Sequence, residues 1–164
     1  GPQDFFETPD EEWERFFQTN VMSGVRLSRE YAKGMAERGW GRVVWVTSVA
    51  CMHYIPDMAM STSLRAGLHG LVRTLSGEYA GSGVTVNAIA PGYIDTDMVA
   101  AVPPAVLEKI VAKIPVGRLG QADEIARGVN GSPGGVGEAD AVGEVVVAEQ
   151  ERRAVVPPLS CRSS

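Results

Sequence analysis

Hydrophobic side chains in the first 40 residues recur at spacings of three and four, which places them on one face of a helix. Thr8 has the form of an N-cap, with Pro9 at the first helical position and Glu11 placed to complete a capping box. Gly39 supplies a C-terminal stop. The pattern predicts one long helix over 8–38. Its apolar face comprises Trp13, Phe16, Phe17, Val21, Met22, Val25, Tyr31 and Met35.

A short apolar run, rich in β-branched residues, follows over 43–48 and predicts a strand buried on both faces, as in parallel sheets. Helical periodicity then returns until Gly81 and Gly83 interrupt it, and residues 84–89 form a second strand pattern. The apolar positions of this second helix are Leu64, Leu68, Leu71, Leu75 and Tyr79.

Two consecutive helix-to-strand units predict an α/β fold. A right-handed crossover between parallel strands would arrange them as a partial, Rossmann-like, doubly wound parallel sheet, the second half of that fold. A further helix opens at Pro103-Pro104 and another covers 121–129. Residues 1–129 are therefore expected to form one partial domain.

The remaining residues, 130–164, differ in character. They start with a glycine-rich loop whose small side chains cannot drive packing. A short strand over 144–148 is the one element expected there, and a loose tail follows it.

Composition narrows the class of protein. Hydrophobic residues make up 45% and charged residues 21%, as in soluble globular proteins, and the net charge of −5 argues against a nucleic-acid partner. No apolar run approaches the roughly 20 residues of a membrane span, and no secretory signal opens the chain. A cytoplasmic protein without a membrane partner is expected. Because the chain opens Gly1-Pro2-Gln3 without Met, it is also expected to be a fragment.

The candidates for metal binding are few. Cys51 and Cys161 lie far apart, and neither they nor His53 and His69 have a metal-ligand spacing. No metal site is predicted.

Several linked motifs carry a family resemblance. They are Phe17-Gln18-Thr19-Asn20-Val21, Arg42 to Ser48, Arg65-Ala66-Gly67-Leu68-His69-Gly70, Val84 to Met98 with its Asn87-Ala88-Ile89-Ala90-Pro91-Gly92 core, and Ile114-Pro115-Val116-Gly117-Arg118-Leu119-Gly120. In this order they resemble the short-chain dehydrogenase/reductase family, in particular its acetoacetyl-CoA and 3-oxoacyl-carrier-protein reductase branch. The resemblance covers about residues 6–129.

This resemblance implies a Rossmann-like sheet that binds NAD or NADP and interconverts a carbonyl and a hydroxyl group on a small molecule. The family's first βαβ half, with its glycine-rich phosphate turn, is absent from these residues. The ribose-reading residue that separates NAD from NADP is absent with it.

The resemblance also assigns catalytic positions. Ser48 takes the place of the serine that orients the substrate carbonyl. The catalytic tyrosine position holds Ser61 and the lysine position holds Arg65. A serine hydroxyl is a poor acid or base near neutrality, whereas an arginine can still donate hydrogen bonds to ribose hydroxyls.

Two further groups are implied. Asn20 matches the family's mid-helix asparagine, which supports the catalytic lysine. Pro91, Gly92, Ile94 and Thr96 match the loop that lines the nicotinamide, where proline fixes the chain and glycine allows close approach.

Three hypotheses remain open from the sequence. The chain is a slow oxidoreductase that uses Ser48, Asn20, Ser61 and Arg65 with the 91–96 loop. Alternatively, it is an inactive partner that forms a homo-oligomer, or assembles with an active relative, through its long helices over 8–38 and 61–81. Finally, it is a truncated remnant without activity.

Overall fold

The computed structural model describes residues 4–130, so the predicted glycine-rich loop, the strand over 144–148 and the tail lie outside the described residues. The helices are α1 (Asp10–Phe17), α2 (Ser23–Glu37), α3 (Ala59–Tyr79), α4 (Asp97–Ala100), α5 (Pro104–Val111) and α6 (Ala122–Asn130). The strands are β1 (Gly41–Val46) and β2 (Val84–Ile89). A π-helical turn, Gln18–Met22, joins α1 to α2, and 3₁₀ turns cover Val49–Cys51 and Ala80–Ser82.

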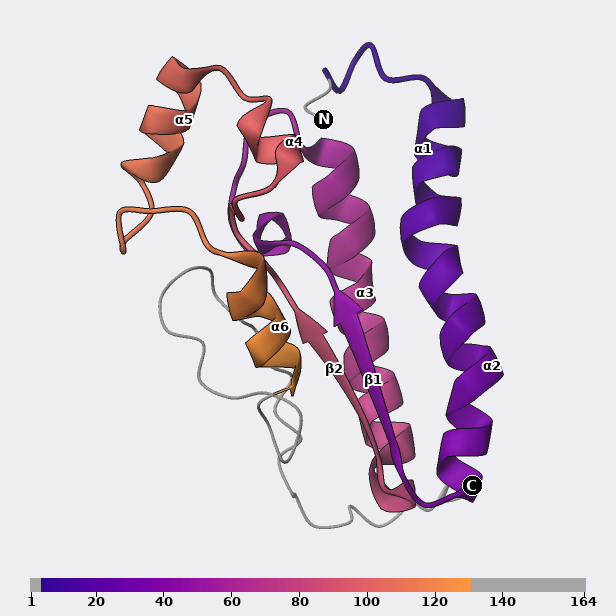
Figure 1. The fold of residues 1–164 in the computed structure, drawn as a ribbon. Helices are drawn as coiled ribbons and strands as arrows, with labels where there is room; N and C mark the ends of the chain where they lie inside the picture. The colour runs from indigo at the N-terminus through magenta and orange to yellow at the C-terminus, as the bar shows by residue number, and fades with distance from the viewer. Residues whose placement is uncertain (1–3, 131–164) are drawn as a thin grey trace, which may run out of the picture.

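The two strands pair in parallel, with Gly41 opposite Val84 and Val46 opposite Ile89. Helix α3 connects them and packs on β2, while α2 packs on β1. Figure 1 shows α2 and α6 on opposite sides of the strands. This arrangement confirms the predicted α/β class as part of a Rossmann-like fold.

The core lies between α3 and the strands. Its fully buried cluster is made of Trp45, Leu68, Val72, Val84, Val86 and Ala88. Leu68 and Val72 of α3 pack here with the alternate residues Val84, Val86 and Ala88 of β2.

The start of the first helix corrects a prediction. Pro9, rather than Thr8, occupies the cap position, and α1 begins at Asp10. The extended backbone of Pro9 (φ −71°, ψ 157°) keeps Thr8 outside the helix, and the Thr8 hydroxyl donates instead to the Asp4 carbonyl at 2.6 Å. The capping box with Glu11 is therefore wrong.

The end of the same helix is as predicted. Gly39 has a left-handed φ of +69°, its N–H donates to the Ala36 carbonyl, and the N–H of Trp40 donates to the Met35 carbonyl. These two bonds form a Schellman motif, in which glycine adopts the left-handed conformation without strain. Helical structure thus runs from Asp10 to Glu37, with the π turn as its one interruption.

The expectation that the first strand is buried on both faces is wrong at its end. Val46 is 62% exposed, whereas every residue of β2 except Thr85 is buried. The cause is unequal cover, because α3 and α6 both pack on β2 whereas the main helix contact of β1 is α2. None of the helices within residues 4–130 is long and apolar enough to cross a bilayer.

Candidate functional site

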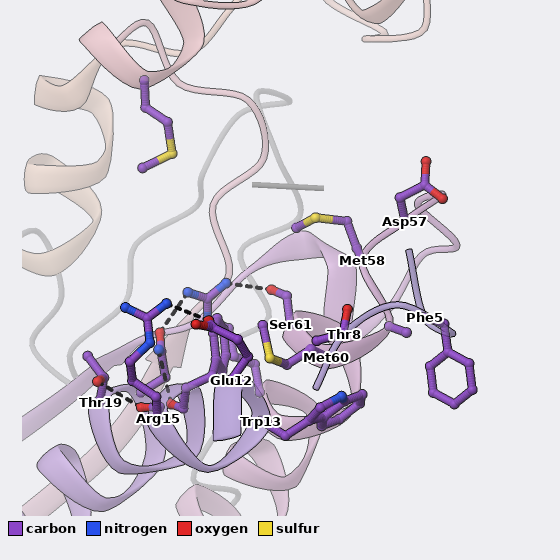
Figure 2. A pocket seen from close by; sticks show the side chains of 15 residues that line it. Phe5, Thr8, Glu12, Trp13, Arg15, Thr19, Asp57, Met58, Met60 and Ser61 are labelled. Atoms are coloured by element: carbon purple, nitrogen blue, oxygen red, sulfur yellow. Dashed lines mark hydrogen bonds and ion pairs between the residues drawn. The ribbon is translucent and has the colours of Figure 1, made fainter. Parts of the chain in front are cut away.

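A cavity of about 440 Å³ lies beside the start of α3 (Figure 2). Helix α1, the π turn, the segment before α3 and the first turns of α3 form most of its wall, and Met98 of α4 completes it. It is lined by Phe5, Thr8, Glu12, Trp13, Arg15, Phe16, Thr19, Asn20, Asp57, Met58, Ala59, Met60, Ser61, Arg65 and Met98.

Three of the predicted site residues meet in this cavity. Arg65 donates from one terminal nitrogen to Ser61 Oγ at 2.7 Å and from the other to Asn20 Oδ1 at 2.8 Å. Ser61 and Arg65 are four residues apart on α3 and so share one helix face. The guanidinium also lies 5.2 Å from the ring centroid of Phe16, which is a cation–π contact.

Asn20 lies in the π turn and reaches Arg65 from there. Its side-chain amide donates to the Phe16 carbonyl at 3.2 Å while its oxygen accepts from Arg65. The extra residue of a π turn leaves a carbonyl without its usual helical partner, and such turns occur often at functional sites. The amide of this mid-helix asparagine is thus hydrogen-bonded through both its nitrogen and its oxygen.

Burial affects the ionisation of two groups here. Burial lowers the pKa of Arg65, and the nearby Cys51 partly offsets this effect. Burial likewise raises the pKa of the Cys51 thiol, against weaker opposing effects that include the Arg65 charge. Cys51 is thus a neutral thiol in the 3₁₀ turn after β1, a neighbour of Arg65 that no sequence motif indicated.

Ser48 lies just beyond the carboxyl end of β1, where its predicted role requires it. Its Oγ accepts a hydrogen bond from the Ala50 N–H at 3.2 Å and so caps the 3₁₀ turn Val49–Cys51. That bond leaves the hydroxyl hydrogen available to donate. Ser48 is not among the residues that line the cavity in which Asn20, Ser61 and Arg65 meet.

The loop after β2 is held on both sides. The Pro91 carbonyl accepts from the Val49 N–H at 3.0 Å, which places this loop beside the turn that Ser48 caps. Ile94 forms a parallel bridge with Gly120, and the Asp95 N–H donates to the Gly120 carbonyl at 2.7 Å.

The predicted nicotinamide loop is therefore near Ser48 but outside the cavity. Gly92 is half-buried within this loop. Thr96 is exposed at the start of α4, and its hydroxyl donates to the Ile94 carbonyl at 3.4 Å.

Sequence reasoning missed the apolar lining of the cavity. Met58 and Met60 lie at the start of α3 whereas Met98 comes from the distant α4, and methionines outside a helical repeat carry no spacing signal. The one signal available was the position of Met58 and Met60 directly before the Ser61 position.

Sequence reasoning gave His69 no role, and the structure gives it a structural one. The Thr47 hydroxyl donates to the Ile89 carbonyl at 3.1 Å, so its contact of 3.0 Å with His69 Nε2 requires the ring to donate. The pKa of His69 is lowered by burial and then by the charge of Arg73, which favours this neutral ring. Within the described ranges, no group of His, Cys, Asp and Glu side chains is arranged to hold a metal ion.

The fold and the site together define the class of protein. The family model for enoyl-(acyl carrier protein) reductase matches residues 1–130, and the chain belongs to the short-chain dehydrogenase/reductase family. Within that family it falls in the acetoacetyl-CoA and 3-oxoacyl-carrier-protein reductase branch. An acetoacetyl-CoA reductase of Cupriavidus necator is 45% identical over 115 residues, which cover 70% of this chain and 47% of that protein.

Solved structures of known proteins match the fold of this chain as well. A 3-oxoacyl-[acyl-carrier protein] reductase from Brucella melitensis matches with a TM-score of 0.72 and 33% identity, over 74% of this chain and 46% of that one. A 7α-hydroxysteroid dehydrogenase in complex with NADH and 7-oxo glycochenodeoxycholic acid matches with a TM-score of 0.72 and 32% identity, over 77% of this chain and 49% of that one. The chain spans about half the length of the curated relatives it matches.

Proposed function

We propose that this chain contributes the substrate-side half of an NAD(P)-dependent oxidoreductase that interconverts a carbonyl and a hydroxyl group. The observation that carries the proposal is the hydrogen-bonded cluster of Asn20, Arg65 and Ser61, located where the family has its asparagine, lysine and tyrosine. The solved relative that binds NADH supports the choice of cofactor class.

The residues present fit one end of a nicotinamide cofactor. A guanidinium has five N–H donors, and Arg65 uses two of them on Ser61 and Asn20, so three remain for ribose hydroxyls. Pro91, Gly92, Ile94 and Thr96 would line the nicotinamide. The described residues contain no glycine-rich strand-to-helix turn for the pyrophosphate, so the fit is limited to the nicotinamide-ribose end.

The cofactor would supply or accept a hydride at the substrate carbon, and the residues of this chain would handle the oxygen. Ser48 can donate its hydroxyl hydrogen to the carbonyl oxygen, on which negative charge develops. Ser61 can pass a proton only slowly, since its hydroxyl is far less acidic than a phenol. Arg65 stays charged and so can hold a ribose without relaying a proton. We therefore expect slow turnover.

The decisive experiment is titration of the 164-residue chain with NADH and NADPH, followed by the fluorescence of the reduced nicotinamide. Arg65→Ala is expected to weaken binding at least tenfold, because three donors are lost. Arg73→Ala, an exposed change on the same helix, is the matched control and should leave binding unchanged. Binding that is the same in wild type and Arg65→Ala would remove Arg65 from the cofactor site.

One observation supports a second candidate function, that of an oligomer partner. Leu27 and Tyr31 are each 59% exposed, and their spacing of four puts both on one face of α2. Such a face fits a homo-oligomer or an assembly with an active relative through the long helices. Light scattering on the chain alone and on its mixture with such a relative tests this candidate, and a monomeric chain that forms no mixed species would exclude it.

A further inference from the structure

The guanidinium of Arg65 has contacts of two kinds. Its terminal nitrogens donate to Ser61 Oγ at 2.7 Å and to Asn20 Oδ1 at 2.8 Å, and its central carbon lies over the ring of Phe16, 5.2 Å from the ring centroid. The hydrogen bonds act on single N–H groups, whereas an aromatic ring attracts the delocalised charge as a whole. The Phe16 ring is therefore a restraint on Arg65 that is independent of the two hydrogen bonds.

The Phe16 ring also supplies a negative electrostatic surface beside this cation. The two acceptors of Arg65 are neutral oxygens, and no carboxylate within residues 4–130 forms an ion pair with it. The face of an aromatic ring is the negative part of its quadrupole, so it attracts a cation placed over it. Arg65 and Phe16 are both half-buried, so water screens this attraction only in part.

The backbone of Phe16 acts on the same cluster. Its carbonyl accepts from the side-chain nitrogen of Asn20 at 3.2 Å, and the oxygen of that side chain accepts from Arg65. Phe16 thus contacts Arg65 directly through its ring, and it orients an acceptor of Arg65 through its carbonyl. A substitution of the Phe16 side chain removes the first of these contacts and leaves the carbonyl in place, so the two contributions can be separated by experiment.

We propose that Phe16 is a positioning residue for Arg65, whose ring holds the guanidinium in the orientation from which its remaining N–H groups bind the cofactor ribose. The proposal rests on the proposed function for the identity of that ligand. An arginine gains more from such a support than a lysine, because its planar fork donates only in fixed directions whereas an ammonium has three rotatable donors. Phe16 acts through Arg65 and reaches no reacting atom itself.

The first test is titration of the full chain with NADH, followed by the fluorescence of the nicotinamide. Phe16→Leu keeps an apolar side chain without the ring and is expected to weaken binding about two- to fivefold, which corresponds to one partly exposed cation–π contact. Phe16→Tyr keeps the ring and should bind NADH as tightly as wild type. Phe17→Leu, the control, removes a neighbouring ring that is not part of the cavity lining and should leave binding unchanged. In an Arg65→Ala background, Phe16→Leu should have no further effect.

The second test is NMR of the chain without cofactor. The ring current of Phe16 is expected to shift the side-chain protons of Arg65 upfield in wild type and in Phe16→Tyr, and this shift should be lost in Phe16→Leu. No shift in wild type, or a shift that survives in Phe16→Leu, would overturn the proposal. If Phe16→Leu does not fold, the shift in wild type and its persistence in Phe16→Tyr decide.

The two tests together separate this proposal from the proposed function. If Arg65→Ala weakens NADH binding and folded Phe16→Leu does not, this proposal alone fails. A loss in Phe16→Leu that is equally large in the Arg65→Ala background also overturns it, because the ring would then act on binding without Arg65. If wild type does not bind NADH, the proposed function fails, and the ring-current shift still decides whether Phe16 holds the guanidinium.

Discussion

At the scale of single residues, the site consists of three polar side chains whose hydrogen-bonding groups complement one another. Asn20 accepts from Arg65 and donates to a helix carbonyl, and Ser61 accepts from the other guanidinium nitrogen. The side-chain amide of Asn20 and the oxygen of Ser61 therefore each have a partner in the cluster, whereas three N–H groups of Arg65 remain for a ligand. The Ser61 hydroxyl keeps its hydrogen, but as an alcohol it is far less acidic than a phenol and so is a poor proton donor.

The double change Ser61→Tyr with Arg65→Lys is expected to raise carbonyl reduction by at least tenfold, because a phenol beside an ammonium is a competent general acid. The cavity in front of Ser61 has room for a ring. The measurement is the rate of reduced-nicotinamide oxidation with acetoacetyl-CoA, at cofactor concentrations that saturate each variant. The single change Arg65→Lys is the control and should give no gain. A double variant that is folded, binds cofactor and is no faster would contradict the assignment of position 61.

How much of the site could be predicted depended on distance along the chain. The pair Ser61 and Arg65 was predicted because the two residues are one helical turn apart and next to a recognisable motif. Asn20 followed from its own motif, and the structure adds that a π turn aims its side chain. The contributions of Met98 and Cys51 could not be predicted, since contact between segments separated by tens of residues depends on tertiary packing that no local pattern encodes.

At the scale of elements, helix α2 is held against β1 by a close approach at Gly24. A Cβ atom at this position would lie 2.3 Å from the ring of Trp45, which is 7% exposed. The helix therefore packs with its backbone almost on the indole. The start of helix α6 is held by side-chain hydrogen bonds instead. The carboxylate of Glu124 accepts from the Gln121 N–H at 2.7 Å, and it accepts two further hydrogen bonds from Arg118 at 2.8 and 2.9 Å.

Gly24→Ala is expected to destabilise the chain by about 1–3 kcal/mol, the usual cost of overpacking. This exceeds the gain of up to about 1 kcal/mol that alanine gives over glycine in a helix. Gly70→Ala is the matched control, because a Cβ there meets nothing within 4 Å and only the gain should remain. Urea denaturation measures both. Two changes of the same sign would show that Trp45 can move away from α2 at little cost.

The acid titration of Glu124 tests the start of α6. The hydrogen bond from Arg118, and after it that from the Gln121 N–H, lower the pKa of Glu124 to about 2. Since the pKa of Glu124 in the folded chain lies below its ordinary value of 4.5, the stabilisation that Glu124 contributes is present above pH 4.5 and is lost as the pH falls toward about 2. A carboxyl ¹³C titration by NMR is expected to give a midpoint near pH 2.

Two arginine variants serve as a pair in that titration. Arg118→Gln should move the midpoint toward 4.5, because it removes the main cause of the shift. Arg127→Gln should move it little, because Arg127 acts only through its charge and is the weakest of the causes. A midpoint at 4.5 in wild type, with the α6 amides still protected from exchange, would contradict the hydrogen bonds described.

Most elements could be predicted from the sequence, and the two errors have the same type of cause. The wrong cap at Thr8 came from treating Pro9 as helical when its backbone is extended. The wrong burial of the first strand came from a run of apolar residues that looks the same whether or not a second helix covers it. Both were decided by neighbouring structure rather than by the local residues.

At the scale of the whole molecule, the described residues form a sheet of two strands in which β1 pairs on one side only. A groove of about 410 Å³ follows its length, between α2 and the strand, and is lined in part by Leu27, Tyr31, Trp45 and Val46. Arg42 is the single charged residue of β1 and lies near its start, so the far end has no charge to oppose pairing. An apolar strand edge with unpaired backbone groups is a site of self-association.

Val46→Lys is therefore expected to weaken self-association of the 164-residue chain at least tenfold, about 1.4 kcal/mol, while leaving its circular dichroism unchanged. The position tolerates a charge because Val46 is 62% exposed, so the change removes an apolar contact between molecules without burying an ammonium. Val106→Lys is the control, because this substitution adds the same charge on α5, away from the strand edge. Val106 is 47% exposed. Sedimentation velocity over a range of protein concentrations measures the association of all three proteins. If both lysine substitutions weaken association equally, net charge rather than the β1 edge governs it. A wild-type chain that stays monomeric at every concentration would show that the groove beside β1 does not attract a second copy.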